Sequence, residues 1–119
     1  MTEFEKEVAA RVAANASDSN LCGSVATFMR TSITSQYSYN FSWMGRPIIQ
    51  YPQDMVAMQE LIWQIKPDLI IETGIAHGGS LIFSASMLAQ LDMCDAIEAG
   101  VSFNPRESRR KVLGIDIDI

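Results

Sequence analysis

Apolar residues recur with helical spacing in the first third of the chain. From Phe4 to Val12 one falls at every fourth position, behind a Thr-x-x-Glu motif at residues 2–5 that is typical of a capped helix start. A second apolar stripe runs over residues 21–33. The two patterns predict an N-terminal helical segment over residues 1–36.

The next segment has no clear period until a third helical pattern begins. Residues 37–43 are aromatic and polar, Gly45-Arg46-Pro47 is typical of a turn, and Ile48 starts a short extended piece. Pro52 suits the first position of a helix, which must end before Pro67. The residues expected on the buried face of this helix are Met55, Met58, Leu61, Ile62 and Ile65.

Strand signals appear on either side of a glycine-rich turn. The apolar run at residues 69–71 is typical of a strand buried on both faces, and residues 112–115 predict a second buried strand. Between them lie the turn at 74–79 and a helix expected over residues 80–91. The order strand, turn, helix, strand predicts an α/β fold with a parallel βαβ unit. The residues expected to face the sheet are Leu81, Ala85, Leu88 and Ala89.

Two parallel strands do not make a domain, because such sheets need several strands and helices on both faces. We therefore expect residues 37–119 to be the start of an α/β domain whose remainder is absent from this chain. A strand edge with unpaired N–H and C=O groups recruits other chains. We therefore also expect self-association, most simply as a homo-oligomer.

Both predicted strands end in a carboxylate, Glu72 and Asp116, at the edge where open parallel sheets bind ligands. The glycines of the turn let the backbone approach a ligand, and the following helix N-terminus offers free N–H groups. Asp116 is placed to accept hydrogen bonds from ribose hydroxyls, and Asp118 is the neighbour most easily confused with it. The candidate cofactor-binding residues are Glu72, Gly74, Gly78, Gly79, Ser80 and Asp116.

The kind of cofactor follows from the turn and its carboxylate. The turn reads G-x-x-x-G-G and lacks the G-x-G-x-x-G fingerprint of dinucleotide sites. Glu72 would repel a pyrophosphate, whereas it would attract the ammonium and the sulfonium of S-adenosylmethionine. The carboxylate of that molecule suits the helix N-terminus and the Ser80 hydroxyl. The pattern therefore favours S-adenosylmethionine over NAD.

Three features keep two interpretations each. His77 is a weak candidate for a catalytic base, although turn histidines are more often plain solvent-facing residues. Ser80 is as suitable for a helix cap as for a ligand contact. The aromatic segment 37–43 either closes over an adenine or acceptor ring or packs in the core, and packing is the commoner outcome.

The charge and the composition of the chain make some classes of binding partner unfavourable. Fourteen acidic residues against nine basic ones give a net charge of −5, so nucleic acid and anionic membranes are poor partners.

The charged N-terminus does not have the pattern of a signal peptide, and no apolar stretch approaches the roughly 18 residues that span a bilayer. Cys22 and Cys94 are too few for a disulfide framework or a zinc site. We therefore expect a cytoplasmic protein with free thiols and no metal site in this chain.

Residues 72–80, Glu-Thr-Gly-Ile-Ala-His-Gly-Gly-Ser, resemble the cephalosporin hydroxylase family. Its members are similar to S-adenosylmethionine-dependent methyltransferases and are related to rhamnosyl O-methyltransferases. The likeness runs upstream through residues 43–47 and 51–54, and downstream to residues 113–118. It covers roughly residues 37–119.

The resemblance implies a Rossmann-like class I methyltransferase fold, incomplete here, with Glu72, Gly74, Gly78 and Asp116 around S-adenosylmethionine. It implies O-methyl transfer to a small-molecule acceptor, a hydroxyl of a sugar or a secondary metabolite. A magnesium ion would be held only by residues beyond this chain. The alternatives are a non-catalytic nucleotide-binding module and a truncated product without activity.

Overall fold

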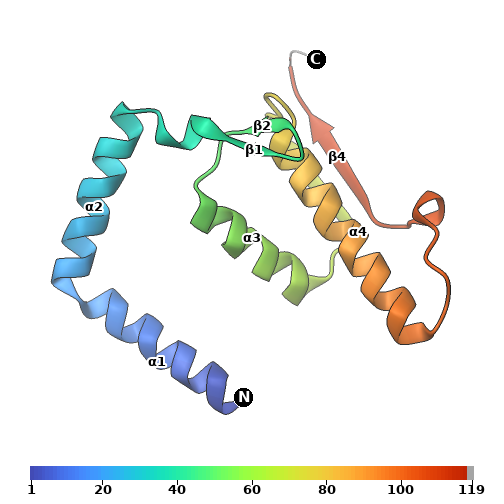
Figure 1. Cartoon of the computed structure of the whole chain (residues 1–119), viewed down its shortest axis with the longest axis horizontal. Coiled ribbons are helices and arrows are strands. Elements are labelled where there is room, and N and C mark those ends of the chain that lie inside the picture. Colours follow the sequence, from blue (N-terminus) through green and yellow to red (C-terminus); the bar gives the residue numbers. More distant parts are fainter. Residues whose placement is uncertain (118–119) are drawn as a thin grey trace. The chain divides into compact units, whose positions relative to one another are not determined.

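The computed structural model of the chain describes residues 1–117. It divides into two compact units, residues 1–37 and 38–119, next to the division at 36/37 expected from the sequence. Figure 1 shows the elements of both units in chain order. Asp118, the neighbour most easily confused with Asp116, lies outside the described residues.

The first unit is a pair of helices, α1 (Glu3–Ser17) and α2 (Ser19–Thr34). The predicted capping box is confirmed, because Glu5 N donates to Thr2 Oγ1 at 3.2 Å and Thr2 N donates to Glu5 Oε2 at 2.5 Å. Asp18 ends α1 and caps α2 by accepting from two of its first N–H groups. Within the described residues α1 buries no side chain and α2 buries only Ser32, so the apolar stripes remain exposed.

The second unit begins with a β-hairpin that the sequence pattern did not reveal. A short 3₁₀ turn (Tyr37–Asn40) leads into β1 (Phe41–Trp43), which pairs antiparallel with β2 (Arg46–Ile48). Met44 and Gly45 connect the strands with φ values of 48° and 80°. Two positive φ angles are typical of a two-residue hairpin turn. The turn therefore falls at residues 44–45 rather than at 45–47.

The predicted βαβ unit is confirmed. α3 (Pro52–Ile65) ends at Lys66, whose φ is 48°, and is followed by β3 (Leu69–Thr73), α4 (Gly79–Ala99), a 3₁₀ turn (Pro105–Glu107) and β4 (Lys111–Ile115). β3 and β4 are parallel, with Leu69 opposite Lys111 and Thr73 opposite Ile115. β3 ends two residues later than expected and β4 begins one residue earlier. The pairing therefore continues up to the glycine turn.

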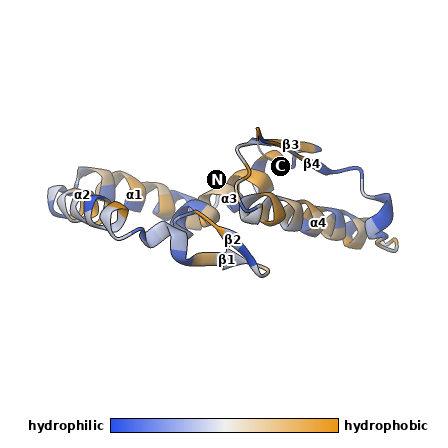
Figure 2. Ribbon diagram, turned by 90° about the horizontal axis from the view of Figure 1, so that it is seen from above, coloured by the Kyte–Doolittle hydropathy of each residue, from blue (hydrophilic) through white to orange (hydrophobic). Residues whose placement is uncertain are grey.

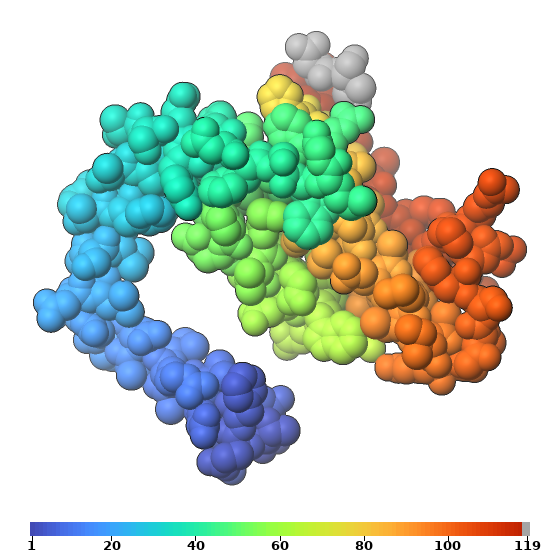
Figure 3. Space-filling view, in the orientation of Figure 1, coloured from blue at the N-terminus to red at the C-terminus, as the bar shows by residue number. Residues whose placement is uncertain are grey.

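The core of the second unit lies around α4. Figure 2 shows α4 between the hairpin and the parallel pair, and α3 lies along α4 (Figure 3). Trp43 reaches α4 from the hairpin, where its Nε1 donates to Ser86 Oγ at 2.7 Å and its ring meets Phe83 edge-on at 4.9 Å. The buried hydrophobic residues are Ile48, Ile62, Phe83, Met87, Leu88 and Leu91.

Two expectations about burial are wrong for the described residues. On α3 only Ile62 is buried and Met55 partly so, whereas Met58, Leu61 and Ile65 are exposed, because α3 touches α4 along one narrow line. β3 and β4 are covered by α4 on one face only. Within residues 1–117 their other face is open, and its residues are Leu69, Ile71, Leu113 and Ile115, each about half exposed.

α4 is longer than expected and uses more than one face. It continues past residue 91 to Ala99 and stops at Gly100, whose φ is 66°. Leu81 approaches Gly114 of β4, and Ala85, Leu88 and Ala89 border Val112 of β4 as expected, although Ala85 and Ala89 are exposed. Other buried residues of α4 face elsewhere: Phe83 meets Trp43 of the hairpin, and Met87 and Leu91 lie beside Ile62 of α3. By length and composition alone α4 is also long and apolar enough to cross a membrane, contrary to the sequence expectation. A core helix passes the same test, and α4 supplies four of the six buried hydrophobic residues.

Arg110, just before β4, ties the connection back to α4. Its Nη1 lies 2.5 Å from Asp92 Oδ1 and its Nη2 lies 2.8 Å from Asp95 Oδ2, and the Arg110 side chain is only 12% exposed. The hydrogen bond to Asp95, followed by that to Asp92, raises the pKa of the Arg110 guanidinium above its usual value. Ser108 Oγ also donates to Asp92. This anchor brings β4 alongside β3 after a connection of polar residues.

The close approach of α4 to β2 is testable by adding one methyl group. Gly79→Ala should destabilise the 38–119 unit by about 1–3 kcal/mol, because its Cβ would lie 2.1 Å from the Pro47 carbonyl oxygen. The control is Gly23→Ala in α2, where nothing lies within 4 Å of an added Cβ, and it should stabilise α2 by up to about 1 kcal/mol. Urea unfolding followed by circular dichroism measures both. An unchanged midpoint for Gly79→Ala would contradict the close approach.

The open face of the parallel pair predicts self-association. Ile71 is 57% exposed and Leu113 is 49% exposed, so the double substitution to serine should shift the chain toward monomer in light scattering. Ile97→Ser is the control, because Ile97 is equally apolar and 71% exposed but lies near the end of α4. A wild-type chain that is monomeric at all concentrations would contradict this prediction.

Candidate functional site

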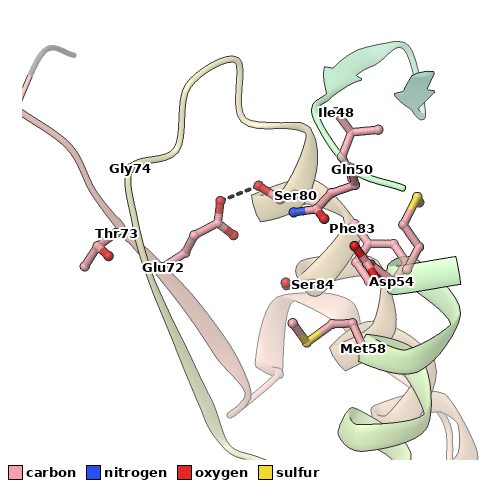
Figure 4. A pocket seen from close by; sticks show the side chains of 11 residues that line it. Ile48, Gln50, Asp54, Met58, Glu72, Thr73, Gly74, Ser80, Phe83 and Ser84 are labelled. Atoms are coloured by element: carbon pink, nitrogen blue, oxygen red, sulfur yellow. Dashed lines mark hydrogen bonds between the residues drawn. The ribbon is translucent and has the colours of Figure 1, made fainter. Parts of the chain in front are cut away.

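A cavity of about 290 Å³ opens at the carboxyl end of β3 (Figure 4). β3 and the start of the turn contribute one wall, the first turns of α4 the floor, and the segment from β2 into α3 the opposite wall. The position agrees with the expectation that an open parallel sheet binds ligands beyond its strand ends. The lining residues are Ile48, Gln50, Asp54, Met55, Met58, Glu72, Thr73, Gly74, Ser80, Phe83 and Ser84.

Glu72 and Ser80 meet inside this cavity. Glu72 is the fourth residue of β3 and lies opposite Gly114 of β4, so its side chain projects on the face that α4 covers. The Ser80 hydroxyl donates to Glu72 Oε1, as Figure 4 shows. Ser80 is the second residue of α4, and Gly78 occupies the N-cap without a side-chain bond. The helix-cap interpretation of Ser80 is therefore wrong, and its hydroxyl holds the carboxylate at the cavity.

The turn after β3 is held by Asp116. Gly74 N donates to Ile115 O at 2.8 Å, which extends the strand pairing by one bond. Asp116 Oδ2 then accepts from Ile75 N at 2.7 Å and from Ala76 N at 3.3 Å. Three residues of the turn have positive φ, namely Gly74, Ala76 and Gly78. Asp116 therefore stabilises a turn conformation that is costly for the non-glycine residue at 76.

Two other glycines permit close packing around the turn. Gly79 is buried against Pro47 and Ile48 and does not line the cavity. Gly114 lies under Ile75, whose Cγ2 would be 2.8 Å from an added Cβ. Of the predicted cofactor-binding residues, the structure brings Glu72, Gly74 and Ser80 to the cavity. Gly78, Gly79 and Asp116 instead shape or hold the turn beside it, and their contacts with a cofactor stay predictions.

His77 and the aromatic segment lie apart from the cavity lining. His77 is exposed at the tip of the turn and is not among the lining residues, so its assignment as a base stays a prediction that the geometry does not favour. Trp43 and Phe41 pack against the core, which agrees with the packing interpretation of that segment. Tyr39 is exposed.

The wall formed by α3 was missed by the sequence interpretation. Met55 and Met58 were assigned to a helix core and Asp54 to the helix dipole, yet all three line the cavity, together with Gln50. A pattern for one buried helix face cannot show that part of that face borders a cavity. The only sequence signal is Asp54 itself, an acid directly before the apolar stripe that begins at Met55.

The cavity is acidic. Glu72 and Asp54 line it, and no Lys, Arg or His in the described part of the chain does so. Among residues 1–117 no group of three or more His, Cys, Asp or Glu is placed to hold a metal ion. The site therefore suits an organic cation better than a phosphate.

The sequence was compared with protein families, curated proteins and solved structures. The family model described as Rhamnosyl O-methyltransferase/CmcI matches residues 35–119, which include the whole cavity, the turn and Asp116. No curated protein and no solved structure matches the chain. The resemblance inferred from residues 37–119 is thereby confirmed. The chain belongs to the rhamnosyl O-methyltransferase/CmcI family of S-adenosylmethionine-dependent methyltransferases.

Proposed function

We propose that this chain binds S-adenosylmethionine for methyl transfer to a hydroxyl of a small-molecule acceptor, a sugar or a secondary metabolite. The observation that carries the proposal is the acidic cavity at the carboxyl end of β3, which contains Glu72 and Asp54 and no basic lining residue. Such a cavity attracts the ammonium and sulfonium of this cofactor and repels the pyrophosphate of NAD. Family membership supports the same cofactor.

The residues present fit the amino-acid part of the cofactor. A volume of about 290 Å³ is at the lower end of the range for small-molecule sites, so the cavity suits that part rather than the whole molecule. Glu72 supplies negative charge, and the first N–H groups of α4 suit the cofactor's own carboxylate. When bound, S-adenosylmethionine supplies the methyl group.

Asp116 takes two roles in this proposal. Its carboxylate holds the turn through Ile75 and Ala76, and each carboxylate oxygen can accept more than one hydrogen bond. Asp116 Oδ1 also accepts from Ile117 N at 2.7 Å. We propose that ribose hydroxyls at the end of β4 donate to this same carboxylate. The cofactor's adenosine part is thereby assigned to the β4 side of the turn.

The contribution of these residues to catalysis is positioning. None of the described cavity residues is a histidine or lysine that would act as a base at neutral pH. Holding the methyl donor in line with an acceptor hydroxyl accelerates transfer by itself. We propose that the acceptor and any magnesium ion are bound by residues outside this cavity, and that the protein acts in the cytoplasm.

The proposed function predicts a ranking of ligands. The chain should bind S-adenosylhomocysteine more tightly than NAD in isothermal titration calorimetry. Glu72→Gln should weaken binding of S-adenosylhomocysteine by about 1.5–3 kcal/mol, the scale of a hydrogen bond to a charged group. Tighter binding of NAD by the wild-type chain would contradict the proposal.

A second prediction separates the two roles of Asp116. Asp116→Ala should raise hydrogen exchange at the Ile75 and Ala76 amides in the free chain and weaken S-adenosylhomocysteine binding by about 1.5–3 kcal/mol. Asp118→Ala, with the same charge change two residues later, is the control and should do neither. Unchanged exchange with weakened binding would leave only the ribose role, and unchanged binding would remove that role.

A further inference from the structure

The acidic wall of the cavity opposite β3 comes from the first turn of α3. Tyr51 is the N-cap, Pro52 follows it, and Asp54 N donates to Tyr51 O at 3.0 Å. Asp54 is exposed and forms no ion pair with any residue that the structure describes. An acid in a first helical turn stabilises the helix dipole wherever its side chain points. That role alone does not require Asp54 to line a cavity with Glu72.

The position of Asp54 relative to Glu72 suggests a shared ligand. Figure 4 shows the two carboxylates on either side of the first turns of α4, with Ser80 and Ser84 between them. They come from α3 and β3, elements that are separate in the chain: α3 packs on α4, and Glu72 of β3 reaches α4 through the Ser80 hydroxyl. A cation between the two carboxylates would be attracted by both.

An ammonium group matches the acceptors that the cavity offers. It carries three N–H donors and no acceptor. Glu72 uses Oε1 to accept from Ser80, and within residues 1–117 its Oε2 has no hydrogen-bond donor. Asp54 adds two carboxylate oxygens and Gln50 adds an amide oxygen from the adjoining segment. The cavity thus provides acceptors from three separate parts of the chain for three donors.

We infer that Asp54 is a second binding carboxylate, which together with Glu72 holds the ammonium of the cofactor's amino-acid part. The inference rests on the proposed function, because it assigns one group of that cofactor to one wall of its site. It gives α3 a part in ligand selection: adenosine compounds without an amino-acid ammonium lose the contact with this wall. Met55 and Met58, on the same helix as Asp54, add apolar lining to this wall.

The test compares two ligands that differ in the amino-acid part. S-adenosylhomocysteine carries the ammonium, whereas 5′-methylthioadenosine has the same adenosine and a thioether but no amino acid. Asp54→Asn keeps the shape of the side chain and removes its charge. It should weaken S-adenosylhomocysteine binding about 10-fold or more and change 5′-methylthioadenosine binding less than about twofold, as measured by calorimetry.

The matched control is Glu60→Gln, the same loss of one charge on the same helix at a residue that does not line the cavity. It should leave both affinities unchanged, and circular dichroism should show the same helix content for both variants. Equal weakening of both ligands by Asp54→Asn, or of neither, would overturn the inference. If Glu72→Gln still weakens S-adenosylhomocysteine binding in that case, the proposed function survives without Asp54. A wild-type chain that binds neither ligand would overturn both.

Discussion

The turn between β3 and α4 depends on a carboxylate that lies about forty residues further along the chain. Asp116 accepts hydrogen bonds from Ile75 N and Ala76 N, and these N–H groups belong to a turn with three positive φ angles. Because Asp116 directly follows β4, the turn has its anchor only when β4 has paired with β3. The direction of α4, and with it the floor of the cavity, follows from this turn.

Around that turn the molecule concentrates negative charge instead of neutralising it. Asp92 and Asp95, by contrast, are paired with Arg110 beside β4. At the cavity Glu72 has only the Ser80 hydroxyl for a partner among the described residues, and Asp54 forms no ion pair there. A folded chain with a net charge of −5 that leaves two acids facing one cavity favours a cationic ligand. The acidic cavity thus suits the positively charged groups of S-adenosylmethionine, the cofactor of the family.

The parts of the structure that were predicted correctly are those set by local chemistry. The capping box at Thr2 needs only residues within one helical turn, and the end of α3 before Pro67 follows from the geometry of proline. The predicted order of strand, turn, helix and strand is confirmed, and both carboxylates lie at the ends of their strands. The hairpin was missed because three-residue strands with a Met-Gly turn carry little periodicity.

By itself the sequence determined the βαβ order, the family and the placement of Glu72 and Asp116 at one edge of the sheet. Local propensity and strand direction are enough for the order and the placement, and the family follows from the motifs within residues 35–119. Only the tertiary structure decided that Ser80 bonds to Glu72, that Asp116 holds the turn, and that Asp54 on α3 borders the same cavity. Those relations join residues from 8 to 41 positions apart. They depend on how α3, α4 and the paired strands pack together, which hydrophobic spacing along one element does not specify.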